Sequence, residues 1–190
     1  MNQALIFLLE TFLGLFALAL LLRFHLQAVR APARNPLSYF LGSLTDFIVR
    51  PARRVVPGLW GYDMSTLLLS WLTELVLVVL VLTLKGWSMG PEVGTAIVAI
   101  CLLAALNLLR LFLYILMVAV IAQAVLSLIG RHNPATPILS SMTRPFLGIF
   151  QRRIPPVGNV DLSPLFVLVI CQVLLMWPVE AIRQSLERLL

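Results

Sequence analysis

The chain has 190 residues, of which 61% are hydrophobic and 12% charged, and its mean hydropathy is +1.00. Soluble domains are about 45 to 50% apolar and about 25% charged, so this composition excludes an ordinary soluble domain and predicts a membrane protein. The net charge of +6 comes from thirteen arginines and one lysine set against eight acidic residues. Arginine favours contacts with phosphate groups, because one guanidinium can bind two phosphate oxygens at once.

Four apolar runs are the candidates for membrane-spanning helices. They cover Leu5–Leu22, Leu67–Leu84, Val93–Ile129 and Leu165–Trp177, and a helix needs about 20 residues to cross roughly 30 Å of hydrocarbon. The third run would be about 55 Å long as one helix, which is too long for a single crossing. We therefore predict spanning helices at about residues 4–22, 65–84, 104–129 and 163–178, with 93–103 as a re-entrant or surface segment.

The second half of the chain repeats the first at an offset of 98 residues. Ten of the 33 positions aligned between Asn35–Leu67 and Asn133–Leu165 are identical, without a gap. The repeats cover residues 1–92 and 93–190, and each contains an apolar helix, a polar segment that opens with Asn-Pro, a basic Pro-rich stretch, an Asp-x-Ser box and a second apolar helix. The sequence therefore predicts an all-α membrane protein made of two tandem helical hairpins.

An amphipathic segment follows the first apolar helix of each repeat. Asn35 and Asn133 are good N-caps, and the prolines after them suit the first helical position. In residues 35–50 and 133–150 apolar side chains recur every three or four residues, which predicts two amphipathic helices along the membrane surface. Pro145 predicts a bend or break in the second of them. Residues 179–190 keep helical spacing and predict a third, short surface helix.

Between each surface helix and the next spanning helix lies a segment that we call the elbow, residues 50–66 and 148–164. We expect Ser163, followed by Pro164, to cap the last spanning helix, with Asp161 adding negative charge near its N-terminus. Ser65, preceded by Asp63, is expected to do the same in the first repeat. The second elbow is turned by Pro155, Pro156 and Gly158. The candidate contacts for lipid headgroups or partners are Arg50, Arg53, Arg54, Arg144, Arg152 and Arg153.

The distribution of arginine predicts how the chain is oriented. Both loops that contain an elbow are rich in arginine, whereas the loop between the repeats offers only Lys85. Basic loops stay on the cytoplasmic side, so both elbows should lie there. That arrangement requires an even number of crossings between the elbows, hence four in all. A fifth crossing would put the two basic loops on opposite sides.

Polar side chains inside the apolar runs are candidates for function at membrane depth. They are Glu10, Glu74, Arg110, Gln123 and Gln172. Glu74 lies about 14 Å beyond Ser65, near the middle of the layer, and its repeat mate is Gln172. Two interpretations stay open: Glu74, Gln123, Gln172 and Asn107 hydrogen-bond between helices, or Glu74 is the centre of a proton or cation site. Glu10 and Arg110 both fall toward the outer half, where they can pair.

The sequence contains no HExxH, CxxC, GxSxG or phosphate-binding loop. His25 and His132 lie near helix ends but not at equivalent positions of the repeats, so we expect surface histidines rather than haem ligands. We predict no catalytic residue, no metal and no cofactor. The expected partners are anionic lipid headgroups, a membrane protein and a further copy of the chain, with no specific nucleic-acid recognition.

The second repeat resembles the YggT family of integral membrane proteins, called YlmG in Gram-positive bacteria and related to plastid proteins. The residues that carry the resemblance are Asn133, Pro134, Thr143, Pro145, Arg152, Pro155, Pro156, Gly158, Asp161, Ser163 and Pro164. The first repeat departs from the pattern, with Phe47, Gly58, Trp60 and Thr66 at motif positions. The resemblance implies a multi-pass protein of the cell inner membrane. Members of the family have been connected with osmotic or potassium stress, with division or nucleoid distribution, and in plastids with haem attachment to a cytochrome b.

The leading functional hypothesis is a non-enzymatic membrane scaffold or assembly factor, linked to osmotic stress, cell division or the assembly of membrane complexes. Its amphipathic helices and arginine-rich elbows would present a cytoplasmic surface to lipid and protein partners. The alternative is a small ion-transport or channel component that uses Glu74 at the interface between the repeats.

Overall fold

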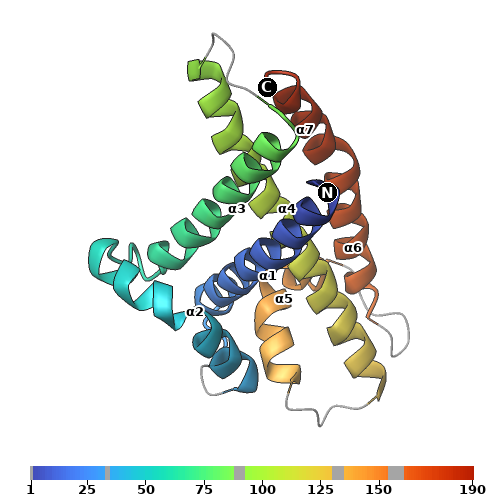
Figure 1. Ribbon diagram of the computed structural model, residues 1–190. Helices are drawn as coiled ribbons and strands as arrows, with labels where there is room; N and C mark the ends of the chain where they lie inside the picture. The colour runs from blue at the N-terminus through green and yellow to red at the C-terminus, as the bar shows by residue number, and fades with distance from the viewer. Residues whose placement is uncertain (1, 33–34, 88–92, 130–134, 154–160) are drawn as a thin grey trace.

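The computed structural model describes residues 2–32, 35–87, 93–129, 135–153 and 161–190, and these are almost entirely helical (Figure 1). The helices are α1 (Asn2–Ala28), α2 (Pro36–Val55), α3 (Met64–Leu84), α4 (Val93–Ile129), α5 (Thr136–Gln151), α6 (Ser163–Leu174), a π-helical turn (Leu175–Val179) and α7 (Glu180–Glu187). Within the described residues, four helical stretches are long and apolar enough to cross a membrane: α1, α3, α4, and the continuous stretch from Ser163 to Glu187. The predicted all-α fold class with four candidate spans is confirmed.

Helix α4 is longer than the spanning helix predicted there. We expected residues 93–103 to form a separate segment, but one helix runs from Val93 to Ile129 without interruption. Beyond Gly94 the helix contains neither glycine nor proline and is rich in alanine and leucine, which are strong helix formers. Nothing in this stretch therefore ends the helix near Leu103, and the predicted boundary is wrong.

The last span also continues where a boundary was predicted. The expected spanning helix ended at residue 178, whereas α6 passes through the π-helical turn Leu175–Val179 directly into α7. Pro178 lies inside this turn. A proline has no N–H to donate, and its ring clashes with the carbonyl four residues earlier. A single π-helical turn is wide enough to accommodate it without ending the helix.

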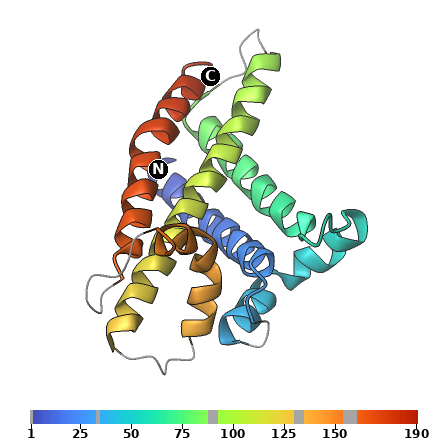
Figure 2. The ribbon, with the colours of Figure 1, turned by 180° about the vertical axis from the view of Figure 1, so that it is seen from behind.

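The helices run between two ends of the molecule. Helices α2 and α5 lie toward one end, the lower one in Figure 1, and both termini lie toward the other. The same arrangement is seen from behind in Figure 2. In each repeat the two long helices contact one another, α1 with α3 and α4 with α6. Helices α2 and α5, which precede the two elbows, therefore share one end of the molecule.

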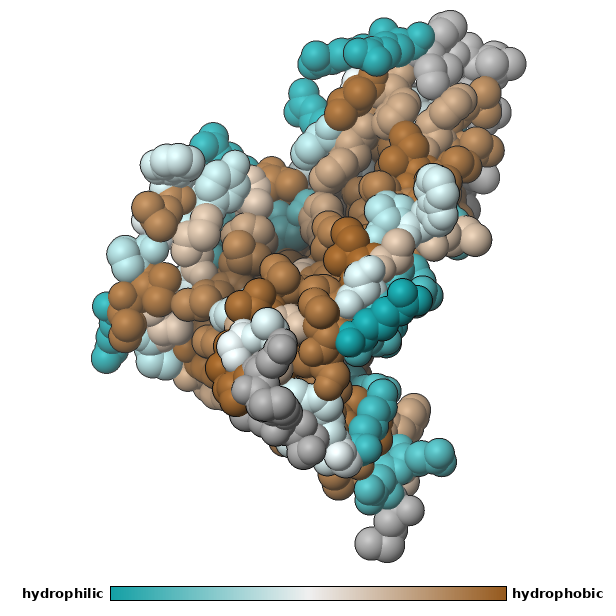
Figure 3. All heavy atoms as spheres, turned by 90° about the horizontal axis from the view of Figure 1, so that it is seen from above, coloured by the Kyte–Doolittle hydropathy of each residue, from teal (hydrophilic) through white to brown (hydrophobic). Residues whose placement is uncertain are grey.

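Two apolar clusters hold the helices together. One joins α1, α2, α4 and α5 and includes Leu26, Leu41, Ile115 and Met142, so it binds the first repeat to the second. The other joins α4 and α5 to α6 and α7. Many large apolar side chains still face outward on α1, α3, α4 and α6, and Figure 3 shows apolar residues over much of the surface seen from above. Apolar surface on this scale is typical of a protein embedded in lipid.

Candidate functional site at the two elbows

The start of α2 is built as predicted. Asn35 precedes Pro36, and its side-chain oxygen accepts the backbone N–H of Ser38 at 2.8 Å. This N-cap uses one of the backbone N–H groups that the first turn of a helix leaves free. Asn133 and Pro134, the equivalent pair of the second repeat, lie outside the described residues.

In the first elbow Asp63, rather than Ser65, caps helix α3. The Asp63 carboxylate accepts the backbone N–H of Thr66 at 3.3 Å and its hydroxyl at 2.6 Å, and Arg53 Nε donates to it at 3.0 Å. Ser65 donates its hydroxyl to the same carboxylate. The prediction that Ser65 caps this helix is therefore wrong. The Asp63 carboxylate accepts the free N–H, and Ser65 donates a hydrogen bond to that carboxylate. Burial raises the pKa of Asp63, but hydrogen bonds from Arg53, Ser65 and Thr66 outweigh burial and hold the pKa at about 2.

The second elbow repeats this arrangement with a neutral partner. Asp161 Oδ1 accepts the backbone N–H of Ser163 at 2.8 Å, and Gln151 Nε2 donates to Asp161 Oδ2 at 2.8 Å. Gln151 is the repeat mate of Arg53. Burial raises the pKa of Asp161, while hydrogen bonding by Ser163 and Gln151 lowers it below its usual value. Ser163 begins α6 without capping it through its side chain, and Pro164 follows in the first turn.

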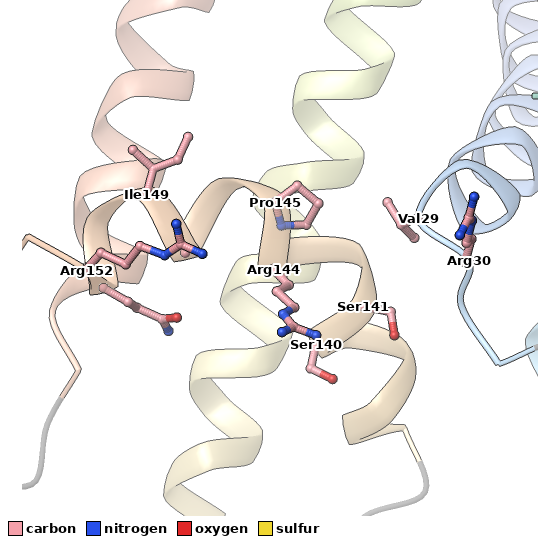
Figure 4. A pocket seen from close by; sticks show the side chains of 10 residues that line it. Val29, Arg30, Ser140, Ser141, Arg144, Pro145, Ile149 and Arg152 are labelled. Carbon is pink, nitrogen blue, oxygen red and sulfur yellow. The ribbon is translucent and has the colours of Figure 1, made fainter. Parts of the chain in front are cut away.

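Pro155, Pro156 and Gly158, which were predicted to turn the second elbow, lie outside the described residues. Helix α5 reaches this elbow with a change of direction at Pro145 (Figure 4), and it stays helical throughout. The predicted bend is thus a bend and not a break. It places the last turns of α5 across the end of the bundle.

Three arginines of the first repeat, Arg23, Arg50 and Arg53, pair with carboxylates of the chain itself. Arg23 and Arg50 both pair with Asp46, at 2.8 and 2.6 Å, while Arg53 pairs with Asp63. The hydrogen bond from Arg23 lowers the pKa of Asp46, and Arg50 adds to the effect, while burial opposes it. Arg54 is exposed. Two of the three arginines predicted here as ligand contacts, Arg50 and Arg53, therefore bind carboxylates of the chain itself.

The second repeat has an open basic pocket instead. It has a volume of about 800 Å³ and lies between the C-terminal end of α1 and helix α5. Its lining consists of Val29, Arg30, Ser140, Ser141, Arg144, Pro145, Gly148, Ile149, Gln151 and Arg152. Figure 4 shows Arg152 and Arg30 on opposite sides, with Arg144 between them. Three arginines and no carboxylate line this pocket in the described part of the chain.

Two of these three arginines, Arg144 and Arg152, were predicted as ligand contacts from the sequence, and Arg153 beside them is exposed without lining the pocket. Arg30 was missed as a site residue. It stands directly after α1 and adopts a left-handed backbone conformation, with φ of 53°. The only sequence signal was its place just beyond an apolar helix, where a glycine is the common residue.

Of the intramembrane polar residues, Glu74 has the most enclosed environment. It is 4% exposed, and Asn107 Nδ2 donates to its Oε2 at 3.2 Å. A second pocket of about 400 Å³ between α1, α3, α4 and α7 is lined by Asn107 and Glu10 and by charged side chains near the opposite end of the molecule. The hydrogen bond between Glu74 and Asn107 fits a packing role for Glu74. An ion site at Glu74 stays the alternative, because its partner Asn107 lines the pocket.

The other polar residues in the spans have separate surroundings. Gln123 accepts a hydrogen bond from the buried Thr143, while Gln172 is exposed. Among the described residues no ion pair joins Glu10 to Arg110, so the pairing expected for them is not formed. They belong to different helices, α1 and α4, and only Glu10 lines the second pocket.

His25 was expected on the surface, but it is buried. Its Nε2 lies 3.3 Å from the carbonyl oxygen of Met142, and its ring packs edge-on against Phe112. It thus helps to hold α1 against α4 and α5. His132 lies outside the described residues. Within the part of the chain that the structure describes, no three His, Cys, Asp or Glu side chains gather as a metal site.

The chain is similar in sequence to a known family of proteins and to several of its members. The model of the CCB3/YggT family matches the chain twice, over residues 2–84 and 102–182. The uncharacterized protein PA0392 of Pseudomonas aeruginosa is 35% identical over 168 residues, which cover 87% of this chain and 83% of the relative. The uncharacterized protein YggT of Escherichia coli K12 is 26% identical over 189 residues, covering 99% of this chain and 96% of the relative. No solved structure matches the chain.

Proposed function

Because the chain belongs to the CCB3/YggT family, with two tandem copies of the family's unit in an all-α membrane fold, we propose that it is a non-enzymatic membrane scaffold or assembly factor. Its working surface is the end of the bundle that carries the two elbows. This surface binds anionic lipid headgroups and a partner membrane protein from the cytoplasmic side of the inner membrane. Such a role fits the osmotic, division and complex-assembly processes that the resemblance implies.

The observation that supports this proposal is the basic pocket beside the second elbow. A guanidinium group that already pairs with a carboxylate has less charge and fewer hydrogen-bond donors left for a partner. Arg23, Arg50 and Arg53 are paired in this way. Arg144 and Arg152 instead face an opening that no carboxylate of the described residues lines. Unneutralised positive charge at a membrane surface attracts anionic lipids and acidic protein segments.

The proposal is tested by affinity purification from native membranes, with the full chain as bait. Replacement of Arg152 and Arg153 by alanine is expected to reduce recovery of the partner, because both charges sit at the proposed surface. A control variant with Arg183→Ala and Arg188→Ala removes the same charge near the C-terminus and should leave recovery unchanged. Undiminished recovery with the Arg152/Arg153 variant would contradict the scaffold proposal.

A second candidate function, an ion-transport component, rests on Glu74. A carboxyl group that is 4% exposed and bonded to Asn107 beside a pocket is a possible site for a proton or a cation. Glu74→Gln keeps the shape and a hydrogen-bonding group but removes the exchangeable proton. If ion flux into proteoliposomes and osmotic tolerance of cells do not change with this substitution, the transport function is excluded.

A further inference from the structure

The basic pocket has few free hydrogen-bond donors besides its arginines. The hydroxyls of Ser140 and Ser141 both donate to the carbonyl of Pro137, at 3.0 and 2.7 Å, and the amide of Gln151 donates to Asp161. Among the described residues, Arg30, Arg144 and Arg152 form no ion pair. The lining therefore selects for an anion that accepts hydrogen bonds from guanidinium groups.

Arg30 occupies a backbone position that favours glycine. Its N–H donates to the carbonyl of Gln27 at 3.0 Å, and the next N–H, of Ala31, donates to Leu26 at 2.9 Å. These two bonds form the Schellman motif that ends a helix, whose left-handed residue is usually glycine. With φ of 53°, Arg30 is strained relative to glycine. Strain of this kind persists where a side chain is needed at that point.

The internal repeat shows how the pocket arises. At the positions of Arg144 and Gly148 the first repeat has Asp46 and Arg50, which form an ion pair one helical turn apart. In the second repeat the carboxylate is replaced by a third positive charge and the arginine by a glycine. A side-chain carbon added at Gly148 would meet nothing within 4 Å. The second repeat thus has an arginine and an empty glycine position where the first repeat has an ion pair.

From these features we propose that the pocket binds the headgroup of a membrane phospholipid that carries two phosphates, as cardiolipin does. The inference rests on the proposed function and names one ligand of the same surface. Arg30 and Arg152 lie on opposite sides of the pocket (Figure 4), an arrangement that suits two linked phosphates, one bound by each arginine. Each guanidinium can bind a phosphate through two parallel hydrogen bonds.

The apolar part of the lining indicates a lipid rather than a soluble phosphate compound. Val29, Pro145 and Ile149 border the same opening, and Ile149 is exposed. Helix α5 is amphipathic and lies at the end of the bundle, where the apolar layer gives way to headgroups. Basic pockets between spanning helices at this level are known sites for lipids with several phosphates.

The test uses the full chain reconstituted in phosphatidylcholine vesicles that contain either cardiolipin or phosphatidylglycerol at equal phosphate content. Native mass spectrometry after extraction measures which lipid stays bound. The wild type is expected to retain cardiolipin and to lose phosphatidylglycerol. Equal retention of both lipids would overturn the two-phosphate proposal. Binding of inorganic pyrophosphate to the detergent-solubilised protein, with no retention of cardiolipin, would assign the pocket to a soluble phosphate compound instead.

Two variants test the pocket itself. Arg144→Gln and Arg30→Gly should each weaken cardiolipin binding by about tenfold, because each removes a charge-assisted contact. Arg30→Gly should at the same time raise the melting temperature, since glycine relieves the strained backbone, so its loss of lipid cannot come from unfolding. The matched control Arg188→Ala removes the same charge from an exposed position near the C-terminus, away from the pocket, and should change binding less than about twofold.

The outcomes separate this inference from the proposed function. Cardiolipin binding that is unchanged in Arg144→Gln and Arg30→Gly would overturn the lipid site. If partner recovery still falls in the Arg152/Arg153 variant in that case, the scaffold proposal stands and the basic surface serves a protein. If lipid binding falls while partner recovery does not change, the lipid site stands and the scaffold proposal fails.

Discussion

The two elbows follow one plan and use their charges in opposite ways. In the first, Arg53 pairs with Asp63, and Asp46 neutralises Arg23 and Arg50. In the second, neutral Gln151 donates to Asp161, and before this elbow Arg144 stands where the first repeat has Asp46. The same backbone plan is therefore stabilised by ion pairs in one copy and carries unpaired arginines in the described part of the other.

The largest effect is expected for Asp63→Asn. This change removes the charge that Arg53, Ser65 and Thr66 all donate to, and it should destabilise the protein by about 2 kcal/mol. The matched change Asp161→Asn should cost less than about 1 kcal/mol, because its partner Gln151 is neutral and an amide oxygen can still accept the N–H of Ser163. Chemical unfolding in detergent micelles measures both, and equal losses would show that the Arg53 pair adds nothing to the first elbow.

The pH dependence of stability should show the same asymmetry. The pKa of Asp63 is held at about 2 in the folded protein, below its unfolded value of roughly 3.9. Its contribution is therefore complete above about pH 4 and is lost as the pH falls toward 2 and below. With Arg53 45% exposed, solvent screening reduces the contribution to the order of 1 kcal/mol.

Melting temperatures measured between about pH 6 and about pH 2 check this expectation. The wild type should lose more stability on acidification than Asp63→Asn, which has no carboxyl group to protonate at this position. Parallel curves for the two proteins would contradict the assigned role of Asp63.

A smaller effect of opposite sign is expected for Trp60→Gly. Trp60 and Gly61 form the turn between Leu59 and Tyr62, and both have positive φ, of 54° and 84°. The second repeat has Gly158 at the position of Trp60. Because Trp60 is 94% exposed, its removal forfeits little packing and should stabilise the protein by about 1 kcal/mol.

Gly61→Ala is the control for this turn, since it introduces strain at the neighbouring position and should destabilise by a similar amount. Thermal unfolding of both variants in micelles provides the comparison. A destabilising Trp60→Gly would mean that the tryptophan makes contacts that outweigh its backbone strain.

The smallest effects distinguish the surface arginines. Arg50→Ala breaks an ion pair with Asp46 on an exposed helix face, where Arg50 is 77% exposed, and should cost about 0.3 to 0.5 kcal/mol. Arg144 occupies the position equivalent to Asp46, and among the described residues it forms no ion pair. Arg144→Ala should therefore not lower the stability, because it removes only repulsion between nearby positive charges. Unfolding measurements at low and high salt test the pair, because salt should erase the loss in Arg50→Ala and leave Arg144→Ala unchanged.

Much of the fold could be predicted from the sequence because its signals are local. Apolar runs of sufficient length, the Asn35 cap before Pro36 and the three-to-four-residue spacing of the surface helices each depend on neighbouring residues only. The boundary near Leu103 was wrong because it came from a length limit set by the bilayer, whereas continuous helical hydrogen bonding carries α4 through this position. At Pro178 the expected short helix is present as α7, joined to α6 by a π-helical turn.

The candidate site could be predicted only in part. Arg144 and Arg152 were identified because arginine beside an elbow is a signal in itself. Arg30 was not, since its role depends on a pocket formed with helix α5, more than a hundred residues further along the chain. Likewise, the sequence shows Asp63 and Ser65 side by side but not that the aspartate caps the helix, because that depends on which side chain reaches the free N–H.

The membrane class, the tandem repeat, the family resemblance and the positions of the basic elbows could all be predicted from the sequence, because composition, periodicity and internal identity are properties of the chain alone. Which charged side chains pair with one another, and which stay unpaired among the described residues, became clear only from the tertiary structure. Pairing depends on distances between side chains of separate helices, and those distances are set only when the helices pack. Two elbows that look alike in the sequence therefore became an internally paired support in one repeat and an open basic pocket in the other.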